Sequence, residues 1–442
     1  MSGAVTVPLS HVLALDPLFS HGVHWVELLI VVVKVVVAFA ALMLSVMLMV
    51  WFERKLVSDM QARIGPNRAG PWGLLQTLAD GIKLFFKEDL LPDRSDRFVF
   101  RLAAYLAIVP AFLAFAIVPV GGLVTIAGHS FELQLADPPI GILFLLAMSS
   151  VSVYGVMLAG WSSGSKYPLL GSVRASAQMI SYEAALGMTV IVVILLTGSA
   201  TNLVGSLSTR AIVDSQSHTF LVSWNLIRTG IVPFVLFLMA ITAELQRPPF
   251  DLAEADTELV GGFNTEYSSI RFAMFFMAEF MNVITMSAVI VTLFFGGPDG
   301  PTAHVFILSW LIPVFWFLGK TFVFLFAYVW LRAALPRLRY DQLMNLGWKA
   351  LIPVSVAWAL VVAAAIVGKW WFIGVIAGLV LGGGLLYRSL RVGSTRGEVF
   401  AGTAVAPPGL PGASPTVRSS LTSVPGAPVG SGSGPHGAGG AR

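Results

Sequence analysis

The chain has 442 residues, of which 56% are apolar and only 11% are charged, and its net charge is +4. An ordinary soluble domain carries about 25% charged residues. Because the chain contains no cysteine, it forms no disulfide, no thiolate zinc site and no cysteine-ligated iron–sulfur cluster. With a mean hydropathy of +0.83, this composition indicates a protein that crosses the membrane several times.

Hydrophobic stretches that are long enough to cross a bilayer recur along the chain. A hydrocarbon core of about 30 Å needs about 20 apolar residues in a helix. Nine stretches meet or approach this length, which predicts an all-α polytopic membrane protein. They cover residues 25–52, 102–122, 140–161, 182–204, 229–246, 271–296, 305–331, 350–368 and 370–390.

Lys and Arg are distributed unevenly among the connecting loops. The loops after the first, third, fifth and seventh stretches carry most of them, and those after the second and sixth carry none. Because cytoplasmic loops are enriched in these residues, we expect residues 1–24 to lie outside and the C-terminus to be cytoplasmic. Residues 392–442, rich in Gly, Pro and Ser, are expected to form a disordered tail. The expected cytoplasmic loops are 53–101, 162–181, 247–270 and 332–349.

Ionisable residues lie within several predicted spans, and Glu183 and Glu244 lie near the inner ends of the fourth and fifth. A charge facing lipid there costs about 2.5–3.5 kcal/mol on insertion scales. Glu27 and Lys34 are seven residues apart on one helix face, which favours a structural salt bridge or snorkelling. Glu279 and Lys320 lie deeper in the sixth and seventh spans, which favours a proton or ion relay.

The first cytoplasmic loop combines tight turns with basic residues. Residues 61–71 are rich in Gly and Pro, and Arg63 and Arg68 can bind carboxylates in fork geometry. Apolar residues then recur at helical spacing over residues 72–87, with Asp80 and Lys83 on the other side. This pattern predicts an amphipathic helix in the membrane interface, and a simple surface anchor is the alternative.

The loop between the fifth and sixth spans gathers carboxylates at the membrane surface. Asp251 and Glu254 match a helix-capping box, but capping leaves the other carboxylates unexplained. Like charges packed this closely hold protons more tightly, so we expect a protonatable cluster. Its members are Glu244, Asp251, Glu254, Asp256, Glu258 and Glu266.

These segments resemble a membrane component of complex I, known as the H subunit in bacteria and as subunit 1 in mitochondria. The resembling motifs follow the family's order and spread over residues 50–340. They cover residues 63–71, 73–76, 79–83, 178–183, 244–267 and 277–282. Where family members often have Glu-Thr-Asn-Arg, this chain has Glu-Leu-Gln-Arg at 244–247. The family has an eight-helix core, which corresponds to residues 25–368, so the span within 369–391 is an addition.

The resemblance implies a membrane subunit of NADH:quinone oxidoreductase, with quinone as its substrate, in the bacterial cell membrane. It implies no cofactor or metal on this chain, and NADH, flavin and iron–sulfur clusters on partner subunits. The implied partners are the peripheral-arm quinone-site and iron–sulfur subunits, the small neighbouring membrane subunits and the lipid bilayer, but no nucleic acid.

The resemblance also implies two groups of site residues. The quinone chamber and its lining loops would use Arg63, Arg68, Asp80, Lys83, Arg247, Phe250, Asp251, Phe263 and Glu266. A relay of charge or protons would use Glu183, Glu244, Glu254, Asp256, Glu258, Glu279 and Lys320.

Two other functions remain open on the sequence. The homologous membrane subunit of an ion-pumping hydrogenase or formate–hydrogen complex shares several helices, but it usually diverges in the acidic loop and needs a partner with a nickel site. A secondary ion transporter would use the mid-span charges as its ion site and would act alone, although the chain has no strong internal repeat.

Overall fold

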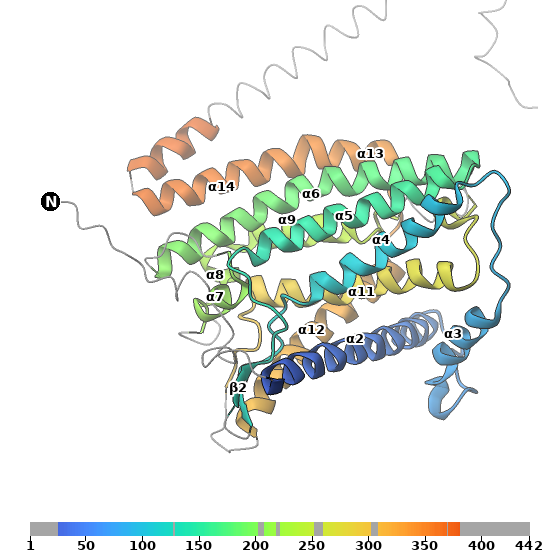
Figure 1. The fold of residues 1–442 in the computed structure, drawn as a ribbon. Helices are drawn as coiled ribbons and strands as arrows, with labels where there is room; N and C mark the ends of the chain where they lie inside the picture. The colour runs from blue at the N-terminus through green and yellow to red at the C-terminus, as the bar shows by residue number, and fades with distance from the viewer. Residues whose placement is uncertain are drawn as a thin grey trace, which may run out of the picture. The chain divides into compact units, whose positions relative to one another are not determined.

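A computed structural model shows that the chain is built almost entirely of helices lying alongside one another (Figure 1). In its described part, seven helices are long and apolar enough to cross a membrane. Two shorter apolar helices, Ile231–Glu244 and Trp370–Val380, fall within the fifth and ninth predicted spans. The predicted all-α polytopic class is therefore confirmed. The structure describes residues 25–126, 129–201, 207–217, 222–251, 260–301, 308–368 and 370–380.

The helices follow the predicted spans in chain order. The long ones are α2 (Trp25–Met60), α4 (Arg97–Phe115), α5 (Gly141–Ser162), α6 (Lys166–Thr201), α11 (Ser269–Phe294) and α12 (Leu308–Ala334). The last long helix joins α13 (Tyr340–Leu346), the π turn η4 (Gly347–Leu351) and α14 (Ile352–Val367). The shorter elements are η2 (Pro71–Gly73), α3 (Gln76–Phe86), α7 (Thr209–Asp214), α8 (Asn225–Arg228), α9 (Ile231–Glu244) and η3 (Gly262–Asn264).

Several helices extend beyond the apolar stretches that predicted them. Because α6 begins at Lys166, most of the segment 162–181, which was expected to be a loop, is helical. Gln178 and Met179 in this segment are buried, and α6 packs against α5 and α9. Buried polar side chains lower the hydropathy of a segment without ending its helix, so a hydropathy profile misplaces such ends.

The predicted amphipathic helix is α3, which lies beside the C-terminal end of α2 (Figure 1). Its apolar side chains Ile82 and Phe85 are exposed, as an interfacial helix requires. Arg54 of α2 donates a hydrogen bond of 2.5 Å to Asp80. Burial raises the pKa of Asp80, but the hydrogen bond and charge of Arg54 outweigh it and hold that pKa below its usual range. Ser269 donates to the carbonyl of Lys87, which ties the end of α3 to α11.

A β-hairpin, which the sequence did not predict, lies between the second and third spans. Strands β1 (Leu123–Ile126) and β2 (His129–Glu132) are antiparallel, with Leu123 opposite Glu132. In Figure 1 the hairpin lies near the N-terminal end of α2, whereas α3 lies near the C-terminal end of α2. The Oε1 atom of Glu27 lies 3.9 Å from Nδ1 of His129, and the Lys34 ammonium lies 5.9 Å from the Phe131 ring centroid. Both charged residues of the first span therefore lie against the hairpin.

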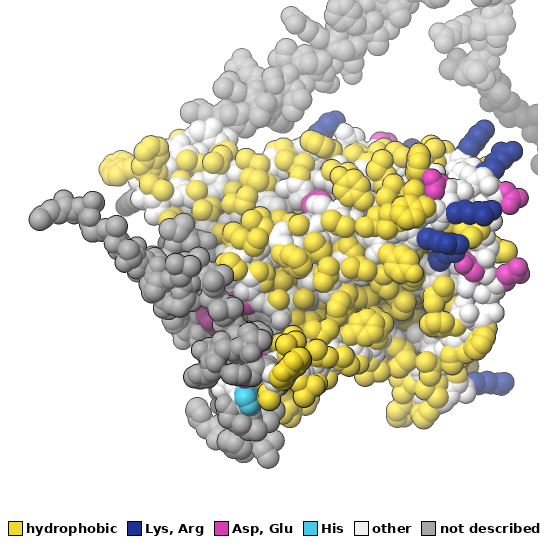
Figure 2. All heavy atoms as spheres, in the orientation of Figure 1, with side chains coloured by type: hydrophobic (Ala, Val, Ile, Leu, Met, Phe, Trp, Pro, Cys, Tyr) yellow, Lys and Arg dark blue, Asp and Glu magenta, His cyan; other side chains and the backbone are white. Residues whose placement is uncertain are grey.

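Charged side chains gather at one end of the face shown in Figure 2, while hydrophobic side chains cover its middle. The charged end is the one where α3 and the start of α4 lie in Figure 1. A hydrophobic surface that ends in charged residues is what a membrane-spanning bundle presents at one side of the bilayer.

Helices α4 and α5 approach each other closely at Gly155. A Cβ atom at this position would lie 2.8 Å from the Ala107 nitrogen and 3.1 Å from the Ala103 oxygen. These are backbone atoms, so Gly155→Ala is expected to push the two helices apart and to lower stability by about 1–3 kcal/mol. The measurement is the thermal unfolding temperature of the purified protein.

The matched control for Gly155 is Gly187 on α6. A Cβ atom at Gly187 meets nothing within 4 Å. Gly187→Ala is therefore expected to be neutral, or to stabilise the helix by up to about 1 kcal/mol. If the two alanine variants have equal stability, then the close packing of α4 against α5 does not require glycine at position 155.

Candidate functional site

A cavity of about 660 Å³ opens at the C-terminal end of α2. Ligand pockets for small molecules typically have volumes of about 300–1,000 Å³. The walls of this α2 cavity come from α2, the turn that follows it, α11 and the end of α12. Its side chains include Glu53, Arg63, Pro66, Phe276, Phe280 and Arg332. The α2 cavity thus combines an aromatic wall with charged groups.

A chain of four charged residues leads from the α2 cavity into the interior. Glu53 forms an ion pair with Arg332, and its Oε1 atom lies 3.5 Å from Nη1 of Arg247. The Nη2 atom of Arg247 lies 2.9 Å from Oε1 of Glu279. The order is therefore Arg332, Glu53, Arg247 and Glu279, with alternating charge.

Arg247 is central to this chain and is only 5% exposed. A buried guanidinium must be paired, and the Arg247 group also stacks over the Phe280 ring at 4.6 Å. Arg247 follows the end of α9, where Pro248 and Pro249 prevent the helix from continuing. Gln178 donates to the carbonyls of Ala243 and Phe250 and so holds both sides of this turn.

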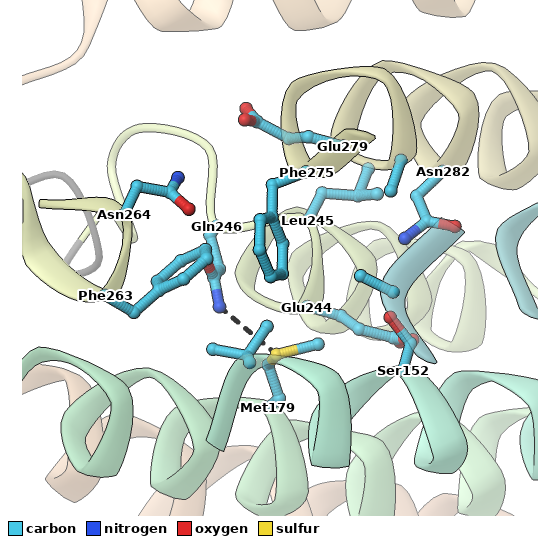
Figure 3. A pocket seen from close by; sticks show the side chains of 13 residues that line it. Ser152, Met179, Glu244, Leu245, Gln246, Phe263, Asn264, Phe275, Glu279 and Asn282 are labelled. Atoms are coloured by element: carbon cyan, nitrogen blue, oxygen red, sulfur yellow. Dashed lines mark hydrogen bonds between the residues drawn. The ribbon is translucent and has the colours of Figure 1, made fainter. Parts of the chain in front are cut away.

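A second, smaller cavity lies on the interior side of Glu279 (Figure 3). Its volume is about 60 Å³, and Glu244 and Glu279 both line it. Figure 3 shows that Phe275 and Leu245 lie between these two carboxylates. The other polar lining residues include Ser152, Asn264 and Asn282. A cavity of this size has room for a few water molecules. We call it the Glu244 cavity.

Two consecutive serines on α5 contact the carboxylates of two other helices. Ser149 donates a hydrogen bond to Glu244 at the end of α9, and Ser150 donates one to Glu183 of α6. A cavity of about 20 Å³ continues from the Glu244 cavity on the Ser149 side. The sequence signal that could have identified these residues is a pair of adjacent hydroxyls inside an apolar span.

The predicted chamber residues divide between the two cavities and their surroundings. Arg63 lines the α2 cavity, and Phe263 lines the Glu244 cavity. Asp80 is bound to Arg54, which itself lines the α2 cavity. Of the other predicted chamber residues, Arg68 is exposed, and Asp251 and Glu266 are half-buried.

Two more predicted residues have structural contacts of their own. Phe250 is buried with its ring 5.6 Å from that of Tyr182, and Lys83 lies 3.6 Å from Asp80.

Three predicted relay residues lie outside the described residues: Glu254, Asp256 and Glu258. Within the described part of the chain, no group of three or more His, Asp or Glu residues could hold a metal ion.

Lys320 lies far from Glu279 along α11. Its Nζ atom donates to the carbonyls of Phe295, Gly297 and Asp299 at 2.8, 3.1 and 2.7 Å. These carbonyls follow the C-terminal end of α11, and residues 279 and 295 are about 24 Å apart along a helix axis at 1.5 Å per residue. Because three acceptors engage all three ammonium N–H groups, Lys320 clamps this loop to α12. No described contact joins Lys320 to Glu279, so the role of Lys320 in a relay stays a prediction.

Comparison with known proteins identifies the family. A family model described as NADH dehydrogenase matches residues 33–363. The NADH-quinone oxidoreductase H subunit of Frankia alni is 48% identical over 378 residues, covering 83% of this chain and 80% of the relative. Its counterpart in Streptomyces avermitilis is 49% identical over 346 residues, covering 76% of this chain and 72% of the relative. The chain therefore belongs to the NADH dehydrogenase family, and its relatives are H subunits of NADH-quinone oxidoreductase.

Proposed function

We propose that the chain forms the membrane side of the quinone chamber of complex I and that the α2 cavity is this part of the chamber. The observation that carries the proposal is a 660 Å³ space with an aromatic wall and with Arg63, Glu53 and Arg332 around it. Phe276 and Phe280 suit an apolar ring or tail, and the charged groups suit a polar head group. Partner subunits would complete the chamber and would carry NADH, flavin and iron–sulfur clusters.

The isoprenoid tail of the quinone would enter between α3 and α2. Exposed apolar side chains on α3 support this route, because an interfacial helix places them at the level of the acyl chains. The indole of Trp51 on α2 donates to the Trp72 carbonyl just before α3, so the two segments are held together. The mouth would face the cytoplasm, with the N-terminus outside and the C-terminus cytoplasmic, as the distribution of Lys and Arg predicts.

Coupling to proton translocation would pass through the four-residue ion-pair chain. Quinone reduction takes up protons and changes the charge beside Glu53 and Arg332. A buried Arg247 that pairs with both Glu53 and Glu279 would transmit this change, since each pairing alters the other. The Glu244 cavity would then carry it to Glu244 and Glu183. The acidic residues Glu254, Asp256 and Glu258 would belong to the same relay.

Replacing Arg63 with Ala tests the chamber. The variant is expected to assemble and to lose roughly tenfold in quinone reductase activity, which corresponds to one charge-assisted hydrogen bond at a ligand site. Electron transfer from NADH to an artificial acceptor on the peripheral arm should stay normal. Both rates are measured on the purified complex.

Arg97 provides the control, because it is exposed at the start of α4 and is absent from the walls of the α2 cavity. Arg97→Ala should leave both rates unchanged. If Arg63→Ala lowers both rates equally, Arg63 supports docking of the peripheral arm and the cavity assignment is wrong.

A further inference from the structure

A series of three small cavities leads from Glu244 toward the end of the bundle opposite the α2 cavity. The first is the Glu244 cavity, and the second, of about 20 Å³, shares Ser152, Glu244 and Asn282 with it. The third, of about 10 Å³, shares Leu145 with the second and reaches Thr209 at the start of α7. We call this third space the Thr209 cavity.

The same parts of the fold line the series from one cavity to the next. On α5 the lining moves from Ser152 back to Leu145 and Ile142, and on α11 it moves from Asn282 forward to Thr292. Residues 282 and 292 are about 15 Å apart along a helix axis, which is half of a hydrocarbon core of about 30 Å. In Figure 1, α7 lies at the same end of the helices as the hairpin, whereas α3 lies at the other end.

Both ends of the series hold a buried oxygen that lacks a hydrogen-bond partner among the described residues. At one end, Glu244 accepts from Ser149 through Oε1, and its Oε2 atom is unsatisfied. At the other end, the amide nitrogen of Gln134 donates to the Thr209 hydroxyl and to the Ile117 carbonyl, and its Oε1 atom is unsatisfied. Buried water is the usual partner of such oxygens. Each end of the series therefore has an acceptor for a water molecule.

Polar groups continue from the Thr209 cavity to the surface. Ser208, which caps α7, donates to Asp137 and lies 2.9 and 2.7 Å from its two carboxylate oxygens. Asp137 is half-buried in the segment between α4 and α5, so its carboxylate has access to solvent. A carboxylate at this position can accept a proton from the interior and release it.

The middle of the series is closed by an apolar side chain. Leu145 is only 1% exposed and separates the second cavity from the Thr209 cavity. The Thr209 cavity is lined mainly by Ile, Val and Leu side chains and has room for about one water molecule. Apolar cavities stay dry, and hydrophobic constrictions gate pores by excluding water. The series is therefore closed in the observed conformation.

We propose that this series is a proton exit from Glu244 to the membrane face opposite the α2 cavity, with Leu145 as its hydrophobic gate and Asp137 as its outlet. When Leu145 changes rotamer, water would enter the Thr209 cavity, and the proton would pass from protonated Glu244 through that water to Asp137. The proposal rests on the proposed function, in which Glu244 belongs to the relay. It gives this chain a proton outlet of its own.

Leu145→Ala is the first test, because it removes the gate. In the complex reconstituted into liposomes without NADH, an imposed pH gradient should decay roughly fivefold faster than with the unaltered complex, since the constriction can then fill with water. Leu145→Met keeps the volume and the apolar character of the side chain and should restore a tight membrane. In the double variant with Glu244→Gln the leak should vanish, because the path begins at this carboxylate.

Leu42→Ala is the matched control for packing. Leu42 on α2 is also 1% exposed, and it lines none of the three cavities. Its replacement removes the same amount of core packing but should leave the pH gradient stable.

A thiol at the gate provides a test that does not depend on pumping. The chain has no cysteine, so Leu145→Cys introduces its only thiol. A small thiol reagent should modify this residue roughly tenfold faster during NADH oxidation than at rest, because thiol modification requires access from water. Leu42→Cys should stay protected in both conditions. The modified subunit is quantified by its mass.

Four results would overturn the proposal. A tight Leu145→Ala complex with a protected Leu145→Cys thiol, beside impaired pumping in Glu244→Gln, contradicts the exit and leaves the relay intact. Equal leaks in Leu145→Ala and Leu42→Ala assign the leak to loosened packing. A leak that persists in the double variant with Glu244→Gln places the path elsewhere. Normal pumping in Glu244→Gln contradicts the relay role of Glu244 and the exit together.

Discussion

Arg247→Met is expected to destabilise the assembled subunit by about 3 kcal/mol or more. Removing one partner of a buried ion pair costs about 3–5 kcal/mol when the remaining charge stays buried. The Glu279 side chain is 29% exposed, so the loss is expected at the lower end of this range. Glu279 would lose the guanidinium that lies 2.9 Å from its Oε1 atom, whereas Glu53 would keep Arg332. The measurement is the amount of assembled complex in membranes and its inactivation temperature.

A second substitution separates charge imbalance from lost packing. Combining Arg247→Met with Glu279→Gln removes both members of the pair and should recover most of the stability. Arg210→Met is the matched control. Arg210 pairs with Asp214, which lies four residues later in the sequence, and this pair is more exposed than Arg247 and Glu279. This variant should cost no more than about 0.5 kcal/mol. Equal losses for Arg247→Met and Arg210→Met would contradict a buried ion-pair chain.

The sequence predicts the helices of this fold well because lipid imposes one simple requirement. A helix must be apolar over about 20 residues to cross a bilayer, so hydropathy alone places both ends of α5 and α11 within two residues. The predicted span 102–122 overlaps α4 but is shifted by five to seven residues toward the C-terminus. The predicted amphipathic helix is likewise visible as α3, because its apolar spacing is local. The hairpin was missed because its strands are only four residues long.

The contacts within the site depend on which face of each helix meets its neighbour, and hydropathy does not contain that information. Glu53 and Arg332 come directly after the first and seventh predicted spans, where the sequence pattern suggests only solvated loop charges. Their pairing across α2 and α12 brings them to the α2 cavity. Conversely, Lys320 and Glu279 are both mid-span charges, which predicts a shared relay, yet the three carbonyl partners of Lys320 follow the C-terminal end of α11.

Glu279→Gln is expected to abolish most quinone reduction and proton pumping together while leaving the complex assembled. The amide keeps the volume and leaves a polar oxygen beside the Arg247 guanidinium, which lies 2.9 Å from Oε1 of Glu279, so the fold should tolerate it better than the loss of Arg247. It can neither carry a negative charge nor exchange a proton. Loss of a proton-transfer group typically costs about 10²–10⁴-fold in rate. NADH oxidation with an artificial acceptor should remain normal.

Two further variants make the result specific to Glu279. Glu279→Asp keeps the carboxylate, although on a shorter side chain, and should retain more of both activities. Asp89→Asn removes a carboxylate that lies 2.7 Å from Arg271 outside both cavities, and it should leave quinone reduction and pumping coupled and near normal. Normal pumping in an assembled Glu279→Gln complex would reduce Glu279 to a structural partner of Arg247. The connection from the α2 cavity to the Glu244 cavity would then need another route, because in the described residues Glu279 is the carboxylate that both pairs with Arg247 and lines the Glu244 cavity.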